Sequence, residues 1–385
     1  MGNLWLAPLT IAALALAACT PIKPQPPPAP TLTRDPGPPV QINGIDLHDG
    51  MIANFGGTYY LYGTQYGCGF HWRDPSTPWC GYGVSTASSL DGPWSAPTQL
   101  FSPEPWQETC RGTGCYNPRM IQRTWGPNDG AFLLWFNAPA DHARTGTNAY
   151  YVMSCSGPAG PCTNPRKPSL PVCVGHGDFS IVLDGANPPW IFCTLPFQVM
   201  AQERLDQSGT TGTGIGARGL AGLGDVEALG AYYDEAAGTW VLTFSRPSCG
   251  FCADGVSTGY ATALGINGPW TARGSLSARS CGGQPRTVVL IDGHVYQQID
   301  QWDGDPNQTD ANTVLAPLAG MECPAGQPPT STASTTSTTT SPPASTTSPV
   351  TTVPPTTTVP PTTTAPPPTT AVPVTPAAPA AGSNP

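Results

Sequence analysis

The sequence predicts an all-β fold, and its composition and patterning both point to that class. The 385 residues include 44 glycines and 49 prolines, about a quarter of the chain. Both residue types interrupt helices, so their abundance indicates many turns and excludes a coiled coil or a helical bundle. Short apolar stretches that alternate with polar residues, as in strands, lie between these turns, and one strand–turn–strand unit recurs along the chain.

The recurring unit occurs five times. Each copy has a small or acidic start, continues as an alternating apolar strand, turns at Gly or Asp and ends in an aromatic-rich strand. The five copies begin around His48-Asp49-Gly50, Asn117-Pro118-Arg119, Gly177-Asp178-Phe179, Val226-Glu227-Ala228 and Gln284-Pro285-Arg286. Their spacing of roughly 50 to 70 residues suits four-stranded blades joined by short loops.

The outer part of the unit also repeats. Asp91-Gly92-Pro93-Trp94 ends one strand pair, and Asn267-Gly268-Pro269-Trp270 ends another. We therefore predict a five-bladed β-propeller over residues 41–323. A β-sandwich is the alternative, but it would not predict the repeated unit.

The two ends of the chain have other compositions. Residues 324–385 contain no Lys, Arg, Asp or Glu and consist mostly of Thr, Pro, Ser and Ala, which predicts a disordered tail. Residues 1–19 form an apolar export signal too short to span a bilayer. Its end, Leu16-Ala17-Ala18-Cys19, resembles a bacterial lipobox, which implies lipidation of Cys19, although no Lys or Arg precedes the apolar run. Residues 20–40 are a Pro-rich spacer, and the expected location is extracytoplasmic, as an envelope lipoprotein or a secreted protein.

The cysteines support export. Of the 13 cysteines, all except Cys19 lie in the predicted propeller, an even set that allows six disulfides. Neighbours in sequence would each close a loop: Cys68/Cys80, Cys110/Cys115 and Cys155/Cys162. A zinc site at Cys249-Gly250-Phe251-Cys252 is the competing interpretation, but a single C-x-x-C without a second pair is weak evidence.

Charge and composition limit the classes of partner and cofactor that we expect. The chain has 15 Lys+Arg against 24 Asp+Glu, which argues against nucleic acid. The loop from Asp303 to Asp310 is rich in oxygen ligands but lacks the EF-hand spacing, so we interpret it as a polar turn and expect neither a metal nor another cofactor. We expect a monomer that contacts a membrane only through a lipid anchor.

Three of the five inner strands begin with a carboxylate, namely Asp49, Asp178 and Glu227. Taken singly, each could be an ordinary turn residue. In a propeller, however, the inner strands begin near the central axis, so these positions converge although they are far apart in sequence. Their coincidence in a chain with 10% charged residues predicts a catalytic site.

This pattern resembles glycoside hydrolase family 43 and its five-bladed relatives, which include arabinanases, xylosidases and exo-galactanases. Asp49 lies before Tyr59-Tyr60 as in the family's first-blade signature, Asp178 precedes an apolar strand, and Val226-Glu227-Ala228 is similar to the motif of the family's general acid. The stretch Ser280 to Thr287 with Asp300-Gln301-Trp302, together with His48, is most similar to the exo-galactanase branch.

The resemblance implies an inverting glycosidase. Asp49 would be the general base and Glu227 the general acid, and Asp178 would raise the pKa of Glu227 and orient it. Trp72 and Trp302 are candidates for stacking on sugar rings, as is Trp79. Gln284 and Arg119 are candidates for bonding sugar hydroxyls, and His48 and His176 for orienting the acids.

The sequence departs from the family at three places. Gly50 and Leu229 replace prolines, and Asn117 stands where some relatives have a carboxylate. Because the three carboxylates are present, we expect an exported hydrolase of arabinose-, xylose- or galactose-containing polysaccharide. Two alternatives remain. One is a non-catalytic carbohydrate-binding propeller on the envelope, which the altered residues favour. The other is a structural adhesin, which would not need the three carboxylates.

Overall fold

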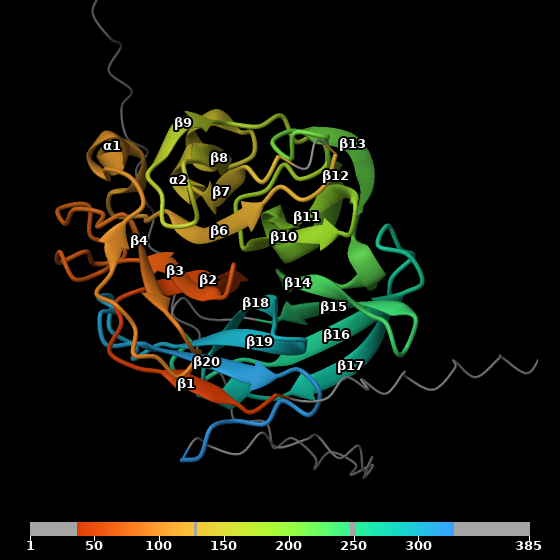
Figure 1. The fold of residues 1–385 in the computed structure, drawn as a ribbon. Helices are drawn as coiled ribbons and strands as arrows, with labels where there is room; N and C mark the ends of the chain where they lie inside the picture. The colour runs from red at the N-terminus through yellow and green to blue at the C-terminus, as the bar shows by residue number, and fades with distance from the viewer. Residues whose placement is uncertain (1–36, 127–128, 247–251, 327–385) are drawn as a thin grey trace, which may run out of the picture. The chain divides into compact units, whose positions relative to one another are not determined.

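The predicted architecture is confirmed: the chain is a five-bladed β-propeller. The computed structural model describes residues 37–126, 129–246 and 252–326, and in these ranges it contains five four-stranded antiparallel sheets (Figure 1). The predicted signal, Cys19, most of the spacer and the tail from residue 327 lie outside the described residues.

Each of the first four blades is a run of four consecutive strands. The first blade contains β2 (His48–Phe55), β3 (Thr58–Thr64), β4 (Tyr82–Ala87) and β5 (Thr98–Gln99). The second contains β6 (Tyr116–Gln122), β7 (Phe132–Asn137), β8 (Tyr150–Cys155) and β9 (Cys162–Arg166). The third contains β10 (Phe179–Asp184), β11 (Asn187–Leu195), β12 (Val199–Leu205) and β13 (Gly212–Arg218). The fourth contains β14 (Glu227–Asp234), β15 (Thr239–Ser245), β16 (Thr258–Ala263) and β17 (Thr271–Ser277).

The fifth blade joins the two ends of the fold. Its strands β18 (Gln284–Ile291), β19 (His294–Gln301) and β20 (Asn312–Pro317) are consecutive, but its outer strand is β1 (Val40–Ile42). β1 pairs antiparallel with β20, with Val40 opposite Leu315 and Ile42 opposite Thr313. The inner strands contact one another in a closed ring, in the order β2, β6, β10, β14, β18 and back to β2.

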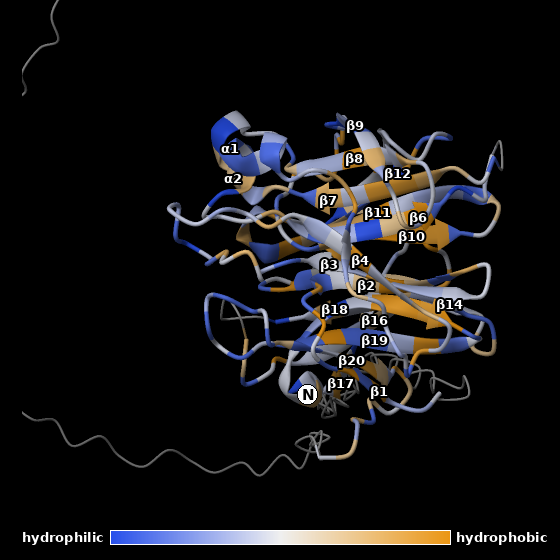
Figure 2. Cartoon of the chain, turned by 60° about the vertical axis from the view of Figure 1, so that its left-hand side comes forward, coloured by the Kyte–Doolittle hydropathy of each residue, from blue (hydrophilic) through white to orange (hydrophobic). Residues whose placement is uncertain are grey.

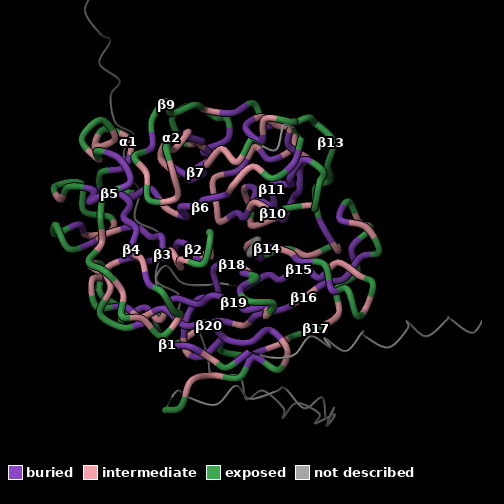
Figure 3. The backbone as a smooth tube through the Cα atoms, in the orientation of Figure 1, coloured by how far each residue is buried: buried purple, intermediate pink, exposed green. Residues whose placement is uncertain are grey.

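The hydrophobic core lies between the blades. Each main cluster of buried apolar side chains joins two successive blades: Leu134 and Phe136 of the second blade, for example, pack with Tyr62 and Tyr82 of the first. Figure 2 shows many of the apolar residues in the strands. Figure 3 shows that the inner strands are mostly buried, whereas outer strands such as β13 and many of the loops are exposed. Because each blade packs against a neighbour on both faces, central strands such as β7 and β11 are buried along nearly their whole length.

The helices are short and lie in the connections. They are η1 (Glu104–Trp106), α1 (Gln107–Cys110), α2 (Pro139–Thr145), η2 (Pro196–Gln198), η3 (Leu220–Gly222) and η4 (Ser280–Gly282). No helix among the described residues is long and apolar enough to cross a membrane.

Disulfides secure the loops. The three pairs expected from sequence proximity are present, and two further bonds join Cys173 to Cys193 and Cys281 to Cys323. The remaining expected pair includes Cys249, which lies outside the described residues.

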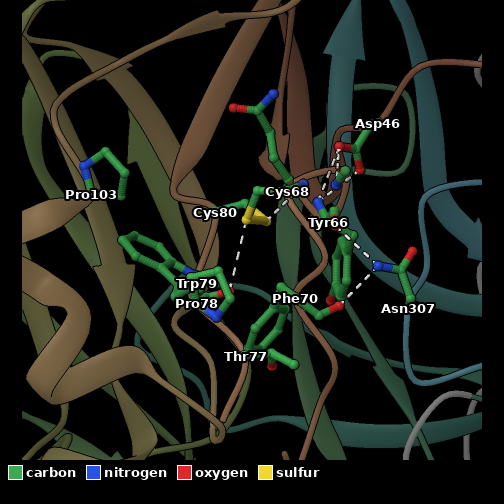
Figure 4. Close-up of a disulfide and its surroundings, with 12 residues drawn as sticks. Asp46, Tyr66, Cys68, Phe70, Thr77, Pro78, Trp79, Cys80, Pro103 and Asn307 are labelled. Carbon is green, nitrogen blue, oxygen red and sulfur yellow. Dashed lines mark hydrogen bonds between the residues drawn. A yellow bond between two sulfur atoms is a disulfide. The ribbon is translucent and has the colours of Figure 1, made fainter. Parts of the chain in front are cut away.

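The loop between β3 and β4 is braced from two sides (Figure 4). The Cys68–Cys80 disulfide closes it, and Asp46 accepts hydrogen bonds from the backbone N–H groups of Tyr66 and Gly67. The Nδ2 of Asn307, in the oxygen-rich loop after β19, donates to the carbonyls of Tyr66 and Phe70 at 3.0 Å each. Asn307 therefore joins the fifth blade to the first.

Candidate active site

The three candidate carboxylates lie at the same end of the inner strands. Asp49 is the second residue of β2, Asp178 directly precedes β10, and Glu227 is the first residue of β14. Register irregularities interrupt the starts of β2, β6, β14 and β18. Asp49 and Asn117 have positive φ angles of 53° and 58°, a conformation that Asp and Asn tolerate better than most residues. Such irregular starts re-aim side chains away from the regular alternation of a strand.

Asp49 is almost completely buried, with 2% of its surface exposed. Its Oδ1 accepts hydrogen bonds from the backbone N–H of Asn117 at 2.7 Å and from Thr64 Oγ1 at 3.0 Å. Its Oδ2 accepts none from the described residues. Burial raises the pKa of Asp49 to about 7, although Arg286 and the Asn117 N–H lower it.

Asn117 connects Asp49 to Asp178. Its backbone binds Asp49, and its Nδ2 donates to Asp178 Oδ1 at 2.9 Å and to Asn137 Oδ1 at 3.2 Å. Its own Oδ1 accepts from Arg286 Nη2 at 2.7 Å and from Arg119 Nη2 at 3.0 Å. All the hydrogen-bonding groups of the Asn117 amide are thereby used inside the site.

Arg286 is the central cation of the cluster. Its Nη1 lies 2.9 Å from Asp178 Oδ2, and its Nε lies 3.7 Å from Oδ2 of Asp300 in β19. Burial alone would lower the pKa of Arg286, but Asp178, Asp49, Asp300 and Glu227 raise it above its usual value. Asp300 accepts the backbone N–H of Asp49 at 2.6 Å, and burial raises the pKa of Asp300 to about 6.

The sequence predicts no role in the site for Asn117, Arg286 or Asp300. One signal was available: the second and fifth repeats begin with the same pattern of amide, Pro and Arg, in Asn117-Pro118-Arg119 and Gln284-Pro285-Arg286. Both arginines are buried, and both donate to Asn117 Oδ1. A buried arginine that recurs at the axis balances the charge of carboxylates that converge there.

Glu227 is half-buried and is oriented by a chain of two hydrogen bonds. Trp302 Nε1 donates to Gln284 Oε1 at 2.9 Å, and Gln284 Nε2 donates to Glu227 Oε2 at 3.1 Å. Because an indole N–H can only donate, it fixes the Gln284 amide with its NH₂ group toward Glu227. Burial and then the charge of Asp178 raise the pKa of Glu227 well above its usual range.

Arg119 supports the backbone of the site. Its Nη1 donates to the carbonyls of Asp49 at 3.0 Å and Gly50 at 2.5 Å, and its Nε donates to the carbonyl of Phe179 at 3.3 Å. Its guanidinium therefore binds carbonyls of the two neighbouring inner strands, β2 and β10, and positions their backbones.

The other candidates lie around the carboxylates. His48 is buried, with its ring centroid 6.0 Å from that of Trp302, and burial lowers its pKa to about 4. His176 is half-buried and stacks on His142 of α2 with 4.6 Å between ring centroids. Trp72 is half-buried in the loop between β3 and β4, under the guanidinium of Arg73. Trp79 is buried in the core of the first two blades.

No sequence family and no curated protein matches the chain. Solved structures do match, and the similarity lies in the fold. A variant of an exo-beta-1,3-galactanase from Phanerochaete chrysosporium with beta-1,3-galactotriose has a TM-score of 0.56 and 19% identity, over 71% of this chain and 60% of that chain. An exo-beta-1,3-galactanase from Clostridium thermocellum has a TM-score of 0.57 and 16% identity, over 71% and 59%.

A GH43 beta-xylosidase/alpha-arabinofuranosidase from a compost metagenome, in complex with xylotriose, has a TM-score of 0.51 and 14% identity, over 69% of this chain and 88% of that chain. The chain thus matches only about 60% of the length of the two galactanases. It shares the five-bladed propeller fold of these glycosidases.

Proposed function

We propose that the chain is a glycoside hydrolase that cleaves arabinose-, xylose- or galactose-containing polysaccharide with inversion. The observation that carries this proposal is the convergence of Asp49, Asp178 and Glu227 from three different blades on one buried arginine, Arg286. A structural ion pair needs one carboxylate for one guanidinium, whereas this site holds several carboxylates in different environments. Different environments for neighbouring carboxylates separate their pKa values, as acid–base catalysis requires.

In this mechanism Glu227 is the general acid. Burial and the nearby charge of Asp178 keep its carboxyl protonated near neutral pH, ready to protonate the departing sugar oxygen. The hydrogen bond from Gln284 orients the group and stabilises the carboxylate that remains after proton transfer.

Asp49 is the general base. Its Oδ1 is held by Thr64 and Asn117, which leaves Oδ2 to take a proton from the attacking water. Arg286 and Arg119 hold Asp178 and the backbone of Asp49 in place and need not touch the sugar. His48, His176, Trp72 and Trp302 remain candidate sugar contacts, with Trp302 also fixing Gln284.

A non-catalytic carbohydrate-binding propeller is the second candidate, and one observation favours it. Asp49 is 2% exposed, and a base must reach water to activate it. Incubation with aryl glycosides of arabinofuranose, xylose and galactose, and with arabinan, xylan and β-1,3-galactan, separates the two candidates. The hydrolase releases sugar, and NMR of the first product shows the inverted anomer. Binding without release of sugar would favour the second candidate.

We also propose export to an oxidising compartment. The described disulfides support this location, because such bonds are rare in reducing compartments. For the anchor, Cys19→Ser should move the protein from the membrane fraction to the soluble fraction. Unchanged fractionation would leave simple secretion. We also propose the domain boundaries given above, with the start of the propeller moved from residue 41 to Val40, the first residue of β1.

A further inference from the structure

One aromatic side chain is both exposed and held in an unfavourable backbone conformation. Phe197 is 91% exposed, the highest value among the large apolar side chains of the described residues. Its φ angle is 64°, in the left-handed region that bulky residues rarely adopt. The tight turn between β11 and β12, in which Leu195 pairs with Val199, requires positive φ angles, but it gives no reason for a Phe. The ring buries almost nothing, and a glycine would fit this backbone without strain.

The position of Phe197 in the blade places it at the end where the carboxylates lie. Phe197 belongs to the connection η2 between β11 and β12. β10, β11 and β12 are successively antiparallel, so this connection lies at the same end of the blade as the start of β10, where Asp178 is located.

Hydrogen bonds on both sides attach this connection to the active site. Thr194 donates to the carbonyl of Asp178 through its backbone N–H at 3.0 Å and through Oγ1 at 2.8 Å. The carbonyl of Gln198 accepts the N–H of Val226, the residue before Glu227, at 3.0 Å. Phe197 lies three residues after Thr194, which limits the separation of their Cα atoms to about 11 Å, and directly before Gln198.

We infer that Phe197 is a binding platform for a sugar residue of the substrate beyond the one that the carboxylates cleave. This inference rests on the proposed function and adds a second subsite to it. A flat aromatic ring of this kind stacks on the apolar C–H face of a pyranose or furanose. A single ring between Pro196 and Gln198, which are both half-buried, is too small to be a protein-docking patch.

The loop geometry explains why the strain is retained. A Phe in the ordinary right-handed region would change the direction of the tight connection and move the ring. Strained conformations cluster at ligand sites, where the surrounding structure holds them in place. Gln198 shares the left-handed conformation with a φ of 51°, so the turn holds two consecutive residues in this region.

The test combines affinity and stability, because a binding role and a structural role predict opposite results. The probes are β-1,3-galactotriose, xylotriose and arabinotriose, titrated calorimetrically into the full chain. For the trisaccharide that the unmodified chain binds, Phe197→Gly should weaken binding roughly three- to tenfold, the usual range for an aromatic contact. Its melting temperature should be unchanged or higher, because glycine relieves the positive φ.

Two matched variants serve as controls. Gln198→Gly relieves the same type of strain but keeps the ring, so it should retain affinity. Leu264→Ala removes an 85% exposed side chain from the turn after β16, at the opposite end of its blade, and should also retain affinity.

Each outcome decides between specific alternatives. Unchanged affinity in Phe197→Gly, or a lower melting temperature with unchanged affinity, overturns the inference and leaves the proposed function standing. If the chain binds a trisaccharide through Phe197 but hydrolyses nothing, the sugar-binding role of Phe197 stands and the proposed hydrolysis is refuted. If it neither binds nor hydrolyses any of the three, both the proposed function and the inference fall.

Discussion

Arg286 and Asp178 form a two-pronged ion pair across the propeller axis. Nη1 of Arg286 lies 2.9 Å from Asp178 Oδ2, and Nη2 lies 3.3 Å from Oδ1. Arg286 comes from the fifth blade and Asp178 from the third, and both are largely inaccessible to solvent. This pair, together with Asn117, holds together the end of the inner strands where the carboxylates lie.

Replacing Arg286 should strongly destabilise the fold. Arg286→Met would leave Asp178, Asp300 and Asp49 without their shared cation, and removal of one partner of a buried pair costs about 3–5 kcal/mol of unfolding free energy. Chemical denaturation measures the loss. Arg286→Lys keeps the charge but not the forked geometry, so its free energy of unfolding should lie between those of Arg286→Met and the unmodified chain. Equal stability of Arg286→Met and the unmodified chain would contradict this role.

The buried carboxylates should make stability fall as pH rises. The folded-state pKa of Asp49 is about 7, above the ordinary value of 3.8, so the native state binds a proton more tightly than the unfolded chain. The stability from this proton is fully present below about pH 4 and is lost as pH rises toward 7. Asp49→Asn cannot ionise, and its unfolding free energy should therefore fall less between pH 4 and pH 7. Parallel pH profiles for the two proteins would refute the raised pKa.

Trp302 should control the pKa of Glu227 through Gln284. Trp302→Phe removes the N–H that fixes the Gln284 amide, so the amide can rotate and present its oxygen to Glu227. An acceptor there stabilises the protonated acid, and the alkaline limb of the kcat/KM profile should move to higher pH. The shift itself is diagnostic, because a loss of packing alone would lower activity without moving the limb.

β1 should be required for closure of the propeller. Deleting residues 1–43 removes Val40 and Ile42, both buried, and exposes the edge of β20. Burial of two such side chains contributes about 3–6 kcal/mol, so the truncated chain should unfold at a much lower temperature or aggregate. Deleting residues 1–36 keeps β1 and is the matched control. Similar melting temperatures for the two truncations would exclude this role.

The contribution of each disulfide to the free energy of unfolding should increase with the length of the loop that it closes. Cys281 and Cys323 are 42 residues apart, whereas Cys110 and Cys115 are 5 apart. Loop-closure entropy predicts a loss of about 4 kcal/mol for the double serine variant of the first pair and about 2 kcal/mol for the second. Denaturant titration of both variants tests the order, and the reverse order would contradict the entropic account.

Local pattern made much of the fold predictable. The five inner strands are predictable because each has the small or acidic start of the repeat, alternates and is followed by an aromatic strand, all within a short stretch. Closure by β1 was not predicted, because three residues carry no periodicity and their partner β20 is more than 270 residues away. Likewise Cys110–Cys115 follows from proximity in sequence, whereas Cys281–Cys323 depends on the tertiary fold.

The site was predictable to the same extent. Asp49, Asp178 and Glu227 are candidates from the sequence because they recur at one position of the repeat, and the structure places them at the same end of the inner strands. The roles of Arg286 and Asp300 can be assigned only from the assembled blades, since their partners Asp178 and Asp49 come from other blades. The positioning role of Arg119 also becomes visible only in the structure, because its Nη1 and Nε donate to carbonyls of the first and third blades.

The most direct test of the account compares Glu227→Gln and Asp49→Asn on two kinds of substrate. Glu227→Gln keeps the shape but lacks the proton, so hydrolysis of a natural linkage should fall by about 10²–10⁴, with a much smaller loss on an aryl glycoside whose leaving group departs unprotonated. Asp49→Asn should be equally damaging on both, because water must be activated whatever leaves. Near-normal polysaccharide hydrolysis by Glu227→Gln would contradict the assignment of the general acid and with it the proposed mechanism.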